Sequence, residues 1–145
     1  SGIFLGSNHH FDLVRPGIAL YGGNPVPNLP NPMAQVIRLQ GRILQVRSVD
    51  TPQSVGYGAS YKVSGSTRIA TVALGYGDGY LRSLGNTGKV WIETHEAQVV
   101  GRISMDLTTV DVTPIPEGLI KVGELVDFIG PNQTVDQVAD SFLKQ

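Results

Sequence analysis

The chain has 145 residues, of which 11 are basic and 12 acidic, giving a formal net charge of −1, and it contains no cysteine. A chain of this length can bury a core of its own as one domain. The near-neutral charge argues against nucleic acid and anionic membranes as partners, and the lack of cysteine excludes disulfides, thiolate metal sites and a cysteine nucleophile. No apolar run approaches the roughly 20 residues of a membrane-spanning helix, and no signal peptide is evident, so we expect a cytoplasmic location.

The first 23 residues differ from the rest of the chain. Residues 18–21 (Ile-Ala-Leu-Tyr) form a continuous apolar run that follows Arg15-Pro16-Gly17 and ends at Gly22. A short apolar run between such residues is typical of a fully buried strand in a parallel sheet or barrel. Because the sequence contains no series of strand–helix–strand units to accompany it, we interpret residues 1–23 as the terminal segment of a larger barrel domain.

The remainder of the chain is predicted to be a linker followed by a β domain. Residues 24–33 contain four prolines and cannot form regular structure. In residues 34–145, short apolar segments separated by turn residues indicate an antiparallel β-barrel or sandwich-like domain. The predicted strands are residues 34–50, 67–75, 89–93, 97–104, 107–112 and 124–129.

Two local features complete the predicted fold. Gly41 interrupts a well-alternating strand and predicts a β-bulge. One short C-terminal helix is predicted after Thr134, which can serve as its N-cap, with Asp136 in the first turn. Its apolar face would consist of Val135, Val138, Ala139 and Phe142. The fold class is therefore mainly β.

Three glycine-containing motifs carry candidate functional side chains: VGYGASY at residues 55–61, LGYGDGY at 74–80 and GRISMD at 101–106. Glycine on both sides of a tyrosine leaves the phenol uncovered and permits unusual backbone angles. Ordinary structural roles are also open, because Gly-Tyr-Gly is common in β-turns and Arg102 with Asp106 can form a solvated ion pair. His9-His10 lacks a third ligand at metal spacing, so no metal site is predicted.

Taken in order, these motifs resemble the alanine racemase family. The resemblance covers residues 6–22, with Leu-Val-Arg-Pro-Gly-Ile-Ala-Leu-Tyr-Gly at its heart, and continues through Ser-Val-Gly-Tyr-Gly at 54–58. It extends through Gly-Tyr-Gly-Asp-Gly at 75–79, GRISMD at 101–106 and Val-Gly-Glu-Leu-Val-Asp-Phe-Ile-Gly at 122–130. Each motif is weak by itself, but all of them in one order and at the family's spacing are specific.

The resemblance implies a fold-type III pyridoxal phosphate (PLP) enzyme, with an N-terminal (β/α)8 barrel that holds PLP and a C-terminal β domain. This chain would hold the end of the barrel in residues 1–23, the linker in 24–33 and the β domain in 34–145. The family is a homodimer in which each active site also uses the partner's β domain. The Schiff-base lysine belongs to a barrel motif that this sequence lacks, so the isolated chain is expected to be inactive and not to bind PLP stably.

By the same resemblance, Tyr57 is the catalytic base that faces this lysine across the substrate. Racemisation removes a proton from one face of a planar carbanion and returns it on the other, so it requires two acid–base groups. The implied reaction interconverts L- and D-alanine and supplies D-alanine for peptidoglycan synthesis.

The cofactor contacts are also implied by the resemblance. Arg15 would pair with the PLP ring nitrogen, and Gly17 and Ile18 would donate backbone N–H groups to its phosphate. Because guanidinium cannot accept a proton, the ring nitrogen would stay unprotonated and withdraw electrons less strongly than beside a carboxylate.

The substrate contacts form a third implied group. Tyr76 and Arg102 resemble residues that line the substrate entrance, Arg82 belongs to the same corridor, and Met105 resembles a backbone contact to the substrate carboxylate. A narrow entrance favours a substrate as small as alanine.

Two alternatives stay open from the sequence. One is a serine or broad-specificity amino-acid racemase, because substrate choice depends partly on barrel residues outside this sequence. The other is a non-catalytic β-barrel interaction module, for which the lack of a basic stripe argues against RNA as the partner.

Overall fold

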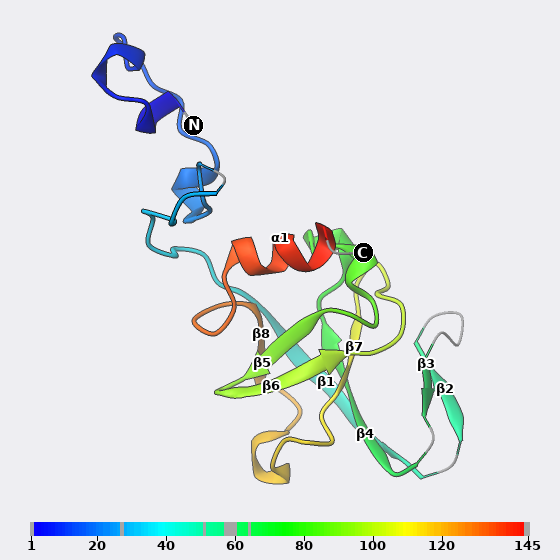
Figure 1. Cartoon of the computed structure of the whole chain (residues 1–145). Coiled ribbons are helices and arrows are strands. Elements are labelled where there is room, and N and C mark those ends of the chain that lie inside the picture. Colours follow the sequence, from blue (N-terminus) through cyan, green and yellow to red (C-terminus); the bar gives the residue numbers. More distant parts are fainter. Residues whose placement is uncertain (1, 27, 51, 57–60, 64, 144–145) are drawn as a thin grey trace.

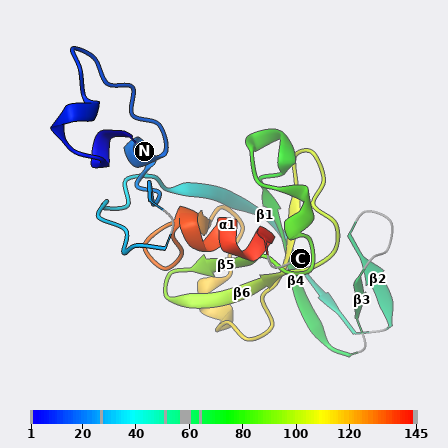
Figure 2. The same ribbon diagram turned by 45° about the horizontal axis from the view of Figure 1, so that its top comes forward.

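The computed structural model describes residues 2–26, 28–50, 52–56, 61–63 and 65–143. These residues form a closed β-barrel and an amino-terminal arm (residues 2–23), drawn in blue in Figure 1, that projects away from the barrel. The view in Figure 2, turned by 45°, shows the same separation. Tyr57, the implied catalytic base, lies outside the described residues.

Six antiparallel strands of the described residues close the barrel in the order β1-β4-β7-β6-β5-β8, with β8 pairing back onto β1. This arrangement confirms the predicted mainly β, antiparallel fold. Each strand pairs with two neighbours, so the barrel leaves none of them as an open edge. The strands are β1 (Leu39–Val49), β4 (Thr67–Ala73), β5 (Lys89–Ile92), β6 (His95–Val99), β7 (Thr108–Asp111) and β8 (Leu125–Ile129).

The observed strands overlap the predicted segments but begin or end at different residues. The segment predicted over 34–50 becomes a strand only from Leu39, and the one predicted over 97–104 leaves the sheet after Val99. Gly101 has a φ of +77°, which side-chain-bearing residues rarely adopt, so the chain turns here into a loop. That loop carries the GRISMD motif.

The bulge predicted at Gly41 is wrong. Gly41 pairs regularly with Val126, and the register shifts lie on either side of it, between Leu39 and Gln40 and between Ile43 and Gln45. A Cβ atom on Gly41 would lie 2.6 Å from Val72 Cγ1. Glycine is needed here because side chains of the neighbouring strand fill the space above it.

The barrel interior is apolar and tightly filled. Fully buried side chains from all six strands meet inside it, including Ile43, Val72, Val90, Val99, Val110 and Phe128. The Tyr80 ring packs edge-to-face on Phe128, with the ring centroids 4.7 Å apart. Tyr80 therefore connects the 74–80 motif directly to the core.

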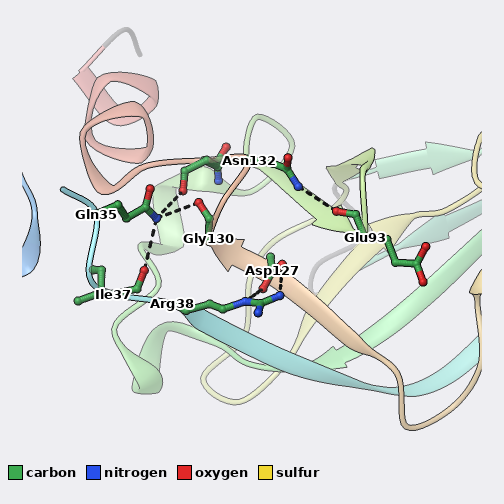
Figure 3. A network of polar contacts seen from close by, with 8 residues as sticks. Gln35, Ile37, Arg38, Glu93, Asp127, Gly130 and Asn132 are labelled. Atoms are coloured by element: carbon green, nitrogen blue, oxygen red, sulfur yellow. Dashed lines mark hydrogen bonds and ion pairs between the residues drawn. The ribbon is translucent and has the colours of Figure 1, made fainter.

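Polar contacts fasten the start of β1 to β8, as Figure 3 shows. The buried carboxylate of Asp127 accepts hydrogen bonds from Arg38 Nε and Nη2, both at 2.8 Å. The hydrogen bond and charge of Asp127 raise the pKa of Arg38. Beside this pair, Gln35 Nε2 donates to the Gly130 carbonyl at 2.8 Å. A carboxylate inside the barrel wall is thereby fully paired.

The described residues contain one α-helix, α1 (Val135–Leu143), as predicted. Thr134 Oγ1 accepts the Gln137 N–H at 3.2 Å, and Gln137 Oε1 accepts the Thr134 N–H at 2.8 Å. This reciprocal pair is a capping box. Of the predicted apolar face, Val138 packs on the barrel core, whereas Ala139 and Phe142 are exposed.

The arm contains short 3-10 turns: η1 (Gly2–Phe4), η2 (Ser7–His9) and η3 (Ile18–Tyr21). The strand predicted over residues 18–21 is therefore a turn in this structure, and only Ala19 of the four is buried. A strand needs a neighbouring strand for its backbone hydrogen bonds, whereas the turn satisfies them locally. Leu20 N–H, for example, donates to the Gly17 carbonyl at 2.9 Å.

The linker (residues 24–33) contains neither helix nor strand among its described residues, as predicted from its prolines. It is held on the first turn of α1 by Asp136. The Asn24 N–H donates to both carboxylate oxygens of Asp136, at 2.9 and 3.1 Å, and Asn31 Nδ2 donates to one of them at 2.9 Å. One side chain of the helix thus fixes both ends of the linker.

A separate two-stranded sheet, β2 (Gln53–Val55) with β3 (Tyr61–Val63), stands beside the barrel. The sequence prediction missed these strands, because each has only three residues and the glycines around Tyr57 dominate the pattern. Val55 and Val63 pack with Val49, Ile69 and Val100 of the barrel in a second apolar cluster.

Candidate functional site

One cleft among the described residues brings two of the predicted motifs together. It has a volume of about 440 Å³ and is lined by Tyr76, Arg82, Ile103, Ser104, Met105 and Asp106. The 74–80 motif supplies the tyrosine, and the 101–106 motif supplies the opposite wall. Residues almost 30 positions apart in the sequence therefore share one opening at the barrel surface.

Close backbone contact joins the two motifs. A Cβ atom on Gly75 would lie 2.3 Å from the Met105 carbonyl oxygen. The Tyr76 N–H donates to the Ser104 carbonyl at 3.0 Å, and the Gly77 N–H donates to the Met105 carbonyl at 2.8 Å. Glycine at position 75 is required for this approach, since any side chain would push the two walls apart.

A short 3-10 turn, η4 (Tyr76–Asp78), presents the tyrosine to the cleft. Asp78 Oδ2 accepts the Gly75 N–H at 2.9 Å and so closes the start of the turn. The Arg82 guanidinium lies 5.7 Å from the centre of the Tyr76 ring, within cation–π range. The cleft thus offers a phenol and a cation side by side, a combination that suits a small ligand with a carboxylate.

Met105 and Arg102 have different relations to this cleft. Met105 lines it, and its N–H donates to no other described residue. Arg102 is exposed and does not line the cleft. No hydrogen bond or ion pair joins Arg102 to Asp106 within the described part of the chain, so the ion pair considered from the sequence is absent there.

The segment that leads to Tyr57 reaches the same loop from the other side. Gly56, the last described residue before Tyr57, lies directly against Gly101: a Cβ atom on Gly56 would lie 2.7 Å from Gly101 Cα. Both glycines have positive φ, +84° and +77°. The three glycine motifs are therefore parts of one assembly rather than separate turns.

The implied cofactor residues lie on the arm. Arg15 is exposed and lines a cleft of about 250 Å³ with residues of η1 and η2. The N–H groups of Gly17 and Ile18 donate to no other described residue, and a Cβ atom on Gly17 would meet no atom within 4 Å. Two open backbone donors beside a cation fit a phosphate-bearing cofactor. None of these three residues lines the Tyr76 cleft.

Other classes of site find no counterpart in the described part of the chain. None of its helices is long and apolar enough to cross a membrane. No group of three or more His, Asp or Glu side chains there is arranged to hold a metal. His10, considered as a ligand from the sequence, instead uses its Nε2 in a 2.9 Å hydrogen bond with the Ile3 carbonyl.

Known proteins with similar sequences share one description. The family model for the alanine racemase C-terminal domain matches residues 36–144. An alanine racemase of Rhodospirillum rubrum is 54% identical over 97% of this chain, and a catabolic alanine racemase of Agrobacterium fabrum is 48% identical over 96% of it. The chain spans 37% and 36% of the lengths of these two relatives.

A solved structure supports the same assignment. The alanine racemase of Bartonella henselae, determined with covalently bound pyridoxal phosphate, superimposes with a TM-score of 0.84 at 41% identity. The similarity covers 97% of this chain and 39% of that one. Motifs, fold and sequence identity therefore agree, and the chain belongs to the alanine racemase family, whose C-terminal domain it carries over residues 36–144.

Proposed function

We propose that this chain works as part of a longer, PLP-dependent alanine racemase that interconverts L- and D-alanine with two bases. The observation that carries the proposal is the meeting of the 75–79 and 101–106 motifs at one cleft, beside the Gly56 backbone that leads to Tyr57. In a homodimer, this assembly would be presented to the PLP-binding barrel of the opposite subunit. The product D-alanine would feed peptidoglycan synthesis.

PLP, when bound, withdraws electrons from the substrate Cα and so makes its hydrogen acidic. Arg15 would hold the ring nitrogen without donating a transferable proton, because guanidinium keeps its proton at any pH the enzyme meets. Gly17 and Ile18 would bind the phosphate with their two N–H groups, which donate to no other described residue. These residues lie on the arm that projects away from the β-barrel, which supports the proposal that they contact a cofactor held in a second domain.

Tyr57 would take the α-proton from one face of the substrate and return it to that same face in the reverse reaction. The second base, a lysine of the PLP-binding barrel, would serve the other face. A free tyrosine has a pKa of about 10, so its phenolate must be stabilised by a nearby cation or hydrogen-bond donors. The proton moves between the Tyr57 oxygen and the substrate carbon, and the carbon keeps the electron pair.

The Tyr76 cleft would admit and orient the substrate. Arg82 places a positive charge at the cleft, which favours entry of the amino-acid carboxylate, and Arg102 would add to the same field. The open Met105 N–H would donate to the substrate carboxylate. Tyr76 on η4 and the 101–106 loop line this cleft, and in the assembled enzyme a narrow, tyrosine-lined entrance would favour alanine over larger amino acids.

The test uses the full-length protein with PLP and compares it with Tyr57→Phe. Exchange of the α-hydrogen with solvent is followed from L- and from D-alanine in D₂O. Loss of one general base is expected to slow exchange from one enantiomer about 10²- to 10⁴-fold while the other is less affected. Tyr61→Phe, a neighbouring tyrosine on β3, is the matched control and is expected to behave as the unmodified protein.

Two results would contradict the proposal. One is a full-length protein that racemises no small amino acid. The other is Tyr57→Phe exchanging both enantiomers at the unmodified rate. If the full-length protein instead prefers serine to alanine, serine would replace alanine as the proposed substrate. The 145-residue chain with PLP serves as the negative control.

A further inference from the structure

Asn86 holds the point at which two of the motifs cross. It lies in the turn between η5 (Arg82–Leu84) and β5, with a φ of +65°. Its side-chain Oδ1 accepts the Gly101 N–H at 2.6 Å. Its own carbonyl accepts a hydrogen bond from Gln98 Nε2 at 2.8 Å. Asn86 is therefore tied to β6 and at the same time holds the first residue of the GRISMD motif.

Gly101 lies in close backbone contact with two other segments, each of which has a glycine at the contact. Gly56 approaches it from β2, and a Cβ atom on Gly101 would lie 2.8 Å from Gly56 Cα. Gly85 approaches from the other side, where an added Cβ atom would lie 2.8 Å from the Gly101 carbonyl oxygen. Glycine surfaces offer little packing to define a position, so a hydrogen bond at this point has an unusually direct effect on geometry.

The β2–β3 sheet contacts the barrel at this crossing and through an apolar cluster. Within the described residues, β2 pairs only with β3, so no ladder of hydrogen bonds joins it to the barrel. It is anchored by the apolar cluster that includes Val100 and by the contact of Gly56 with Gly101. A hydrogen bond that fixes the position of Gly101 therefore also restricts the position of Gly56, the residue that precedes Tyr57 in the sequence.

We propose that Asn86 is a positioning residue for the racemase site. Its side chain sets the Gly101–Gly56 crossing, from which both the Tyr57 segment and the GRISMD loop depart. The inference rests on the proposed function, because it assigns Asn86 a part in placing the base on one face of the substrate. It adds a residue that carries no chemistry itself and lies in none of the three motifs.

The test compares two substitutions in the full-length protein with PLP. Asn86→Gly removes the acceptor oxygen but keeps a residue that adopts positive φ without strain. Asn86→Asp keeps an oxygen acceptor at the same position. Asn132→Gly is the matched control, because Asn132 Nδ2 also holds a distant backbone atom, the Glu93 carbonyl at 2.8 Å, away from the cleft. Thermal unfolding checks that each variant folds.

The first readout is structural. Hydrogen–deuterium exchange, followed by mass spectrometry, should be faster in the peptide that contains Gly101 in Asn86→Gly but not in Asn132→Gly. Asn86→Asp should keep most of the protection, because the Gly101 N–H still has an acceptor.

The second readout is catalytic and distinguishes the two faces. The equilibrium constant of racemisation is unity, so kcat/KM must fall equally in both directions, but the isotope effect of α-deuterated substrate need not change equally. Misplacement of one base should lower kcat of Asn86→Gly by about tenfold to about 100-fold with a smaller change in KM. The substrate isotope effect on kcat should rise in one direction only, and Asn86→Asp should stay close to the unmodified protein.

Several results would overturn the inference. Unchanged kinetics in Asn86→Gly, isotope effects that rise equally in both directions, the same changes in Asn132→Gly, or an equal loss in Asn86→Asp would each show that Asn86 has no positioning role. These outcomes leave the proposed function intact. Failure of the unmodified protein to racemise would overturn the function itself.

Discussion

Apolar side chains are buried in the barrel but exposed in the amino-terminal arm. In the barrel, Ile43 and Phe128 are 0% exposed, whereas in the arm Phe11 is 88% and Leu13 is 79% exposed. The two regions do not differ in how apolar these residues are. They differ in whether the chain supplies partner strands: the barrel closes on itself, and the arm has only local turns.

The difference indicates which apolar side chains are already buried within this chain and which need another surface to cover them. A soluble protein rarely leaves many large apolar side chains exposed along one segment unless another surface covers them. The arm also carries Arg15 and the open N–H groups of Gly17 and Ile18. The proposed PLP-binding barrel would cover the apolar side chains and complete the cofactor contacts at the same time.

The largest expected effect lies in the barrel core. Phe128→Ala removes a fully buried ring and its edge-to-face contact with Tyr80. We expect a loss of about 3–5 kcal/mol in the free energy of unfolding, measured by urea denaturation of the 145-residue chain.

Phe11→Ala is the matched control in the arm, because it makes the same substitution at an 88% exposed site. In the 145-residue chain it should change the free energy of unfolding by no more than about 0.5 kcal/mol. In the full-length protein, the proposed covering of the arm predicts a larger loss. Equal effects at the two positions in the short chain would contradict the contrast between barrel and arm.

A second prediction concerns the buried phenol that joins the 74–80 motif to the core. Burial raises the pKa of Tyr80 well above its ordinary value of 10.0. The raised pKa means that the folded state favours the neutral phenol. The contribution of this phenol to the free energy of unfolding is fully present below pH 10, and it is lost at higher pH because the tyrosine of the unfolded state ionises. The loss should reach about 1.4 kcal/mol by pH 11.

The measurement is urea denaturation from pH 8 to pH 11 of the unmodified chain and of Tyr80→Phe. Phenylalanine keeps the ring against Phe128 but cannot ionise, so its curve should lack this part of the alkaline decline. A difference between the two proteins that stays constant across the pH range would show that Tyr80 does not titrate in this way.

The smallest effect on the barrel is expected at the junction with the arm. Asp136→Ala removes the acceptor of the Asn24 and Asn31 hydrogen bonds that fix the linker to α1. Hydrogen–deuterium exchange of residues 22–34 should become much faster, while the free energy of unfolding of the barrel should fall by only about 0.5 kcal/mol. Asp140→Ala, an exposed acid on the same helix, should leave exchange in the linker unchanged.

Local sequence patterns predicted much of this fold because their causes are local. Alternation of apolar residues located the strands of the barrel, the prolines located the linker, and Thr134 marked the start of α1. The positions of the strand ends depended on neighbours. Gly41 is a glycine because of Val72 on another strand, which no pattern around Gly41 could indicate.

The candidate site shows the same division. The sequence by itself determined which residue types are available and, through motif order, the family to which they belong. Only the tertiary structure decided that the 74–80 and 101–106 motifs share a cleft, that Arg102 lies outside it, and that Asn86 holds the crossing of Gly56 and Gly101. The reason is physical: composition and periodicity report what each residue prefers, whereas a close approach of two backbones depends on strands that are paired far apart in the sequence.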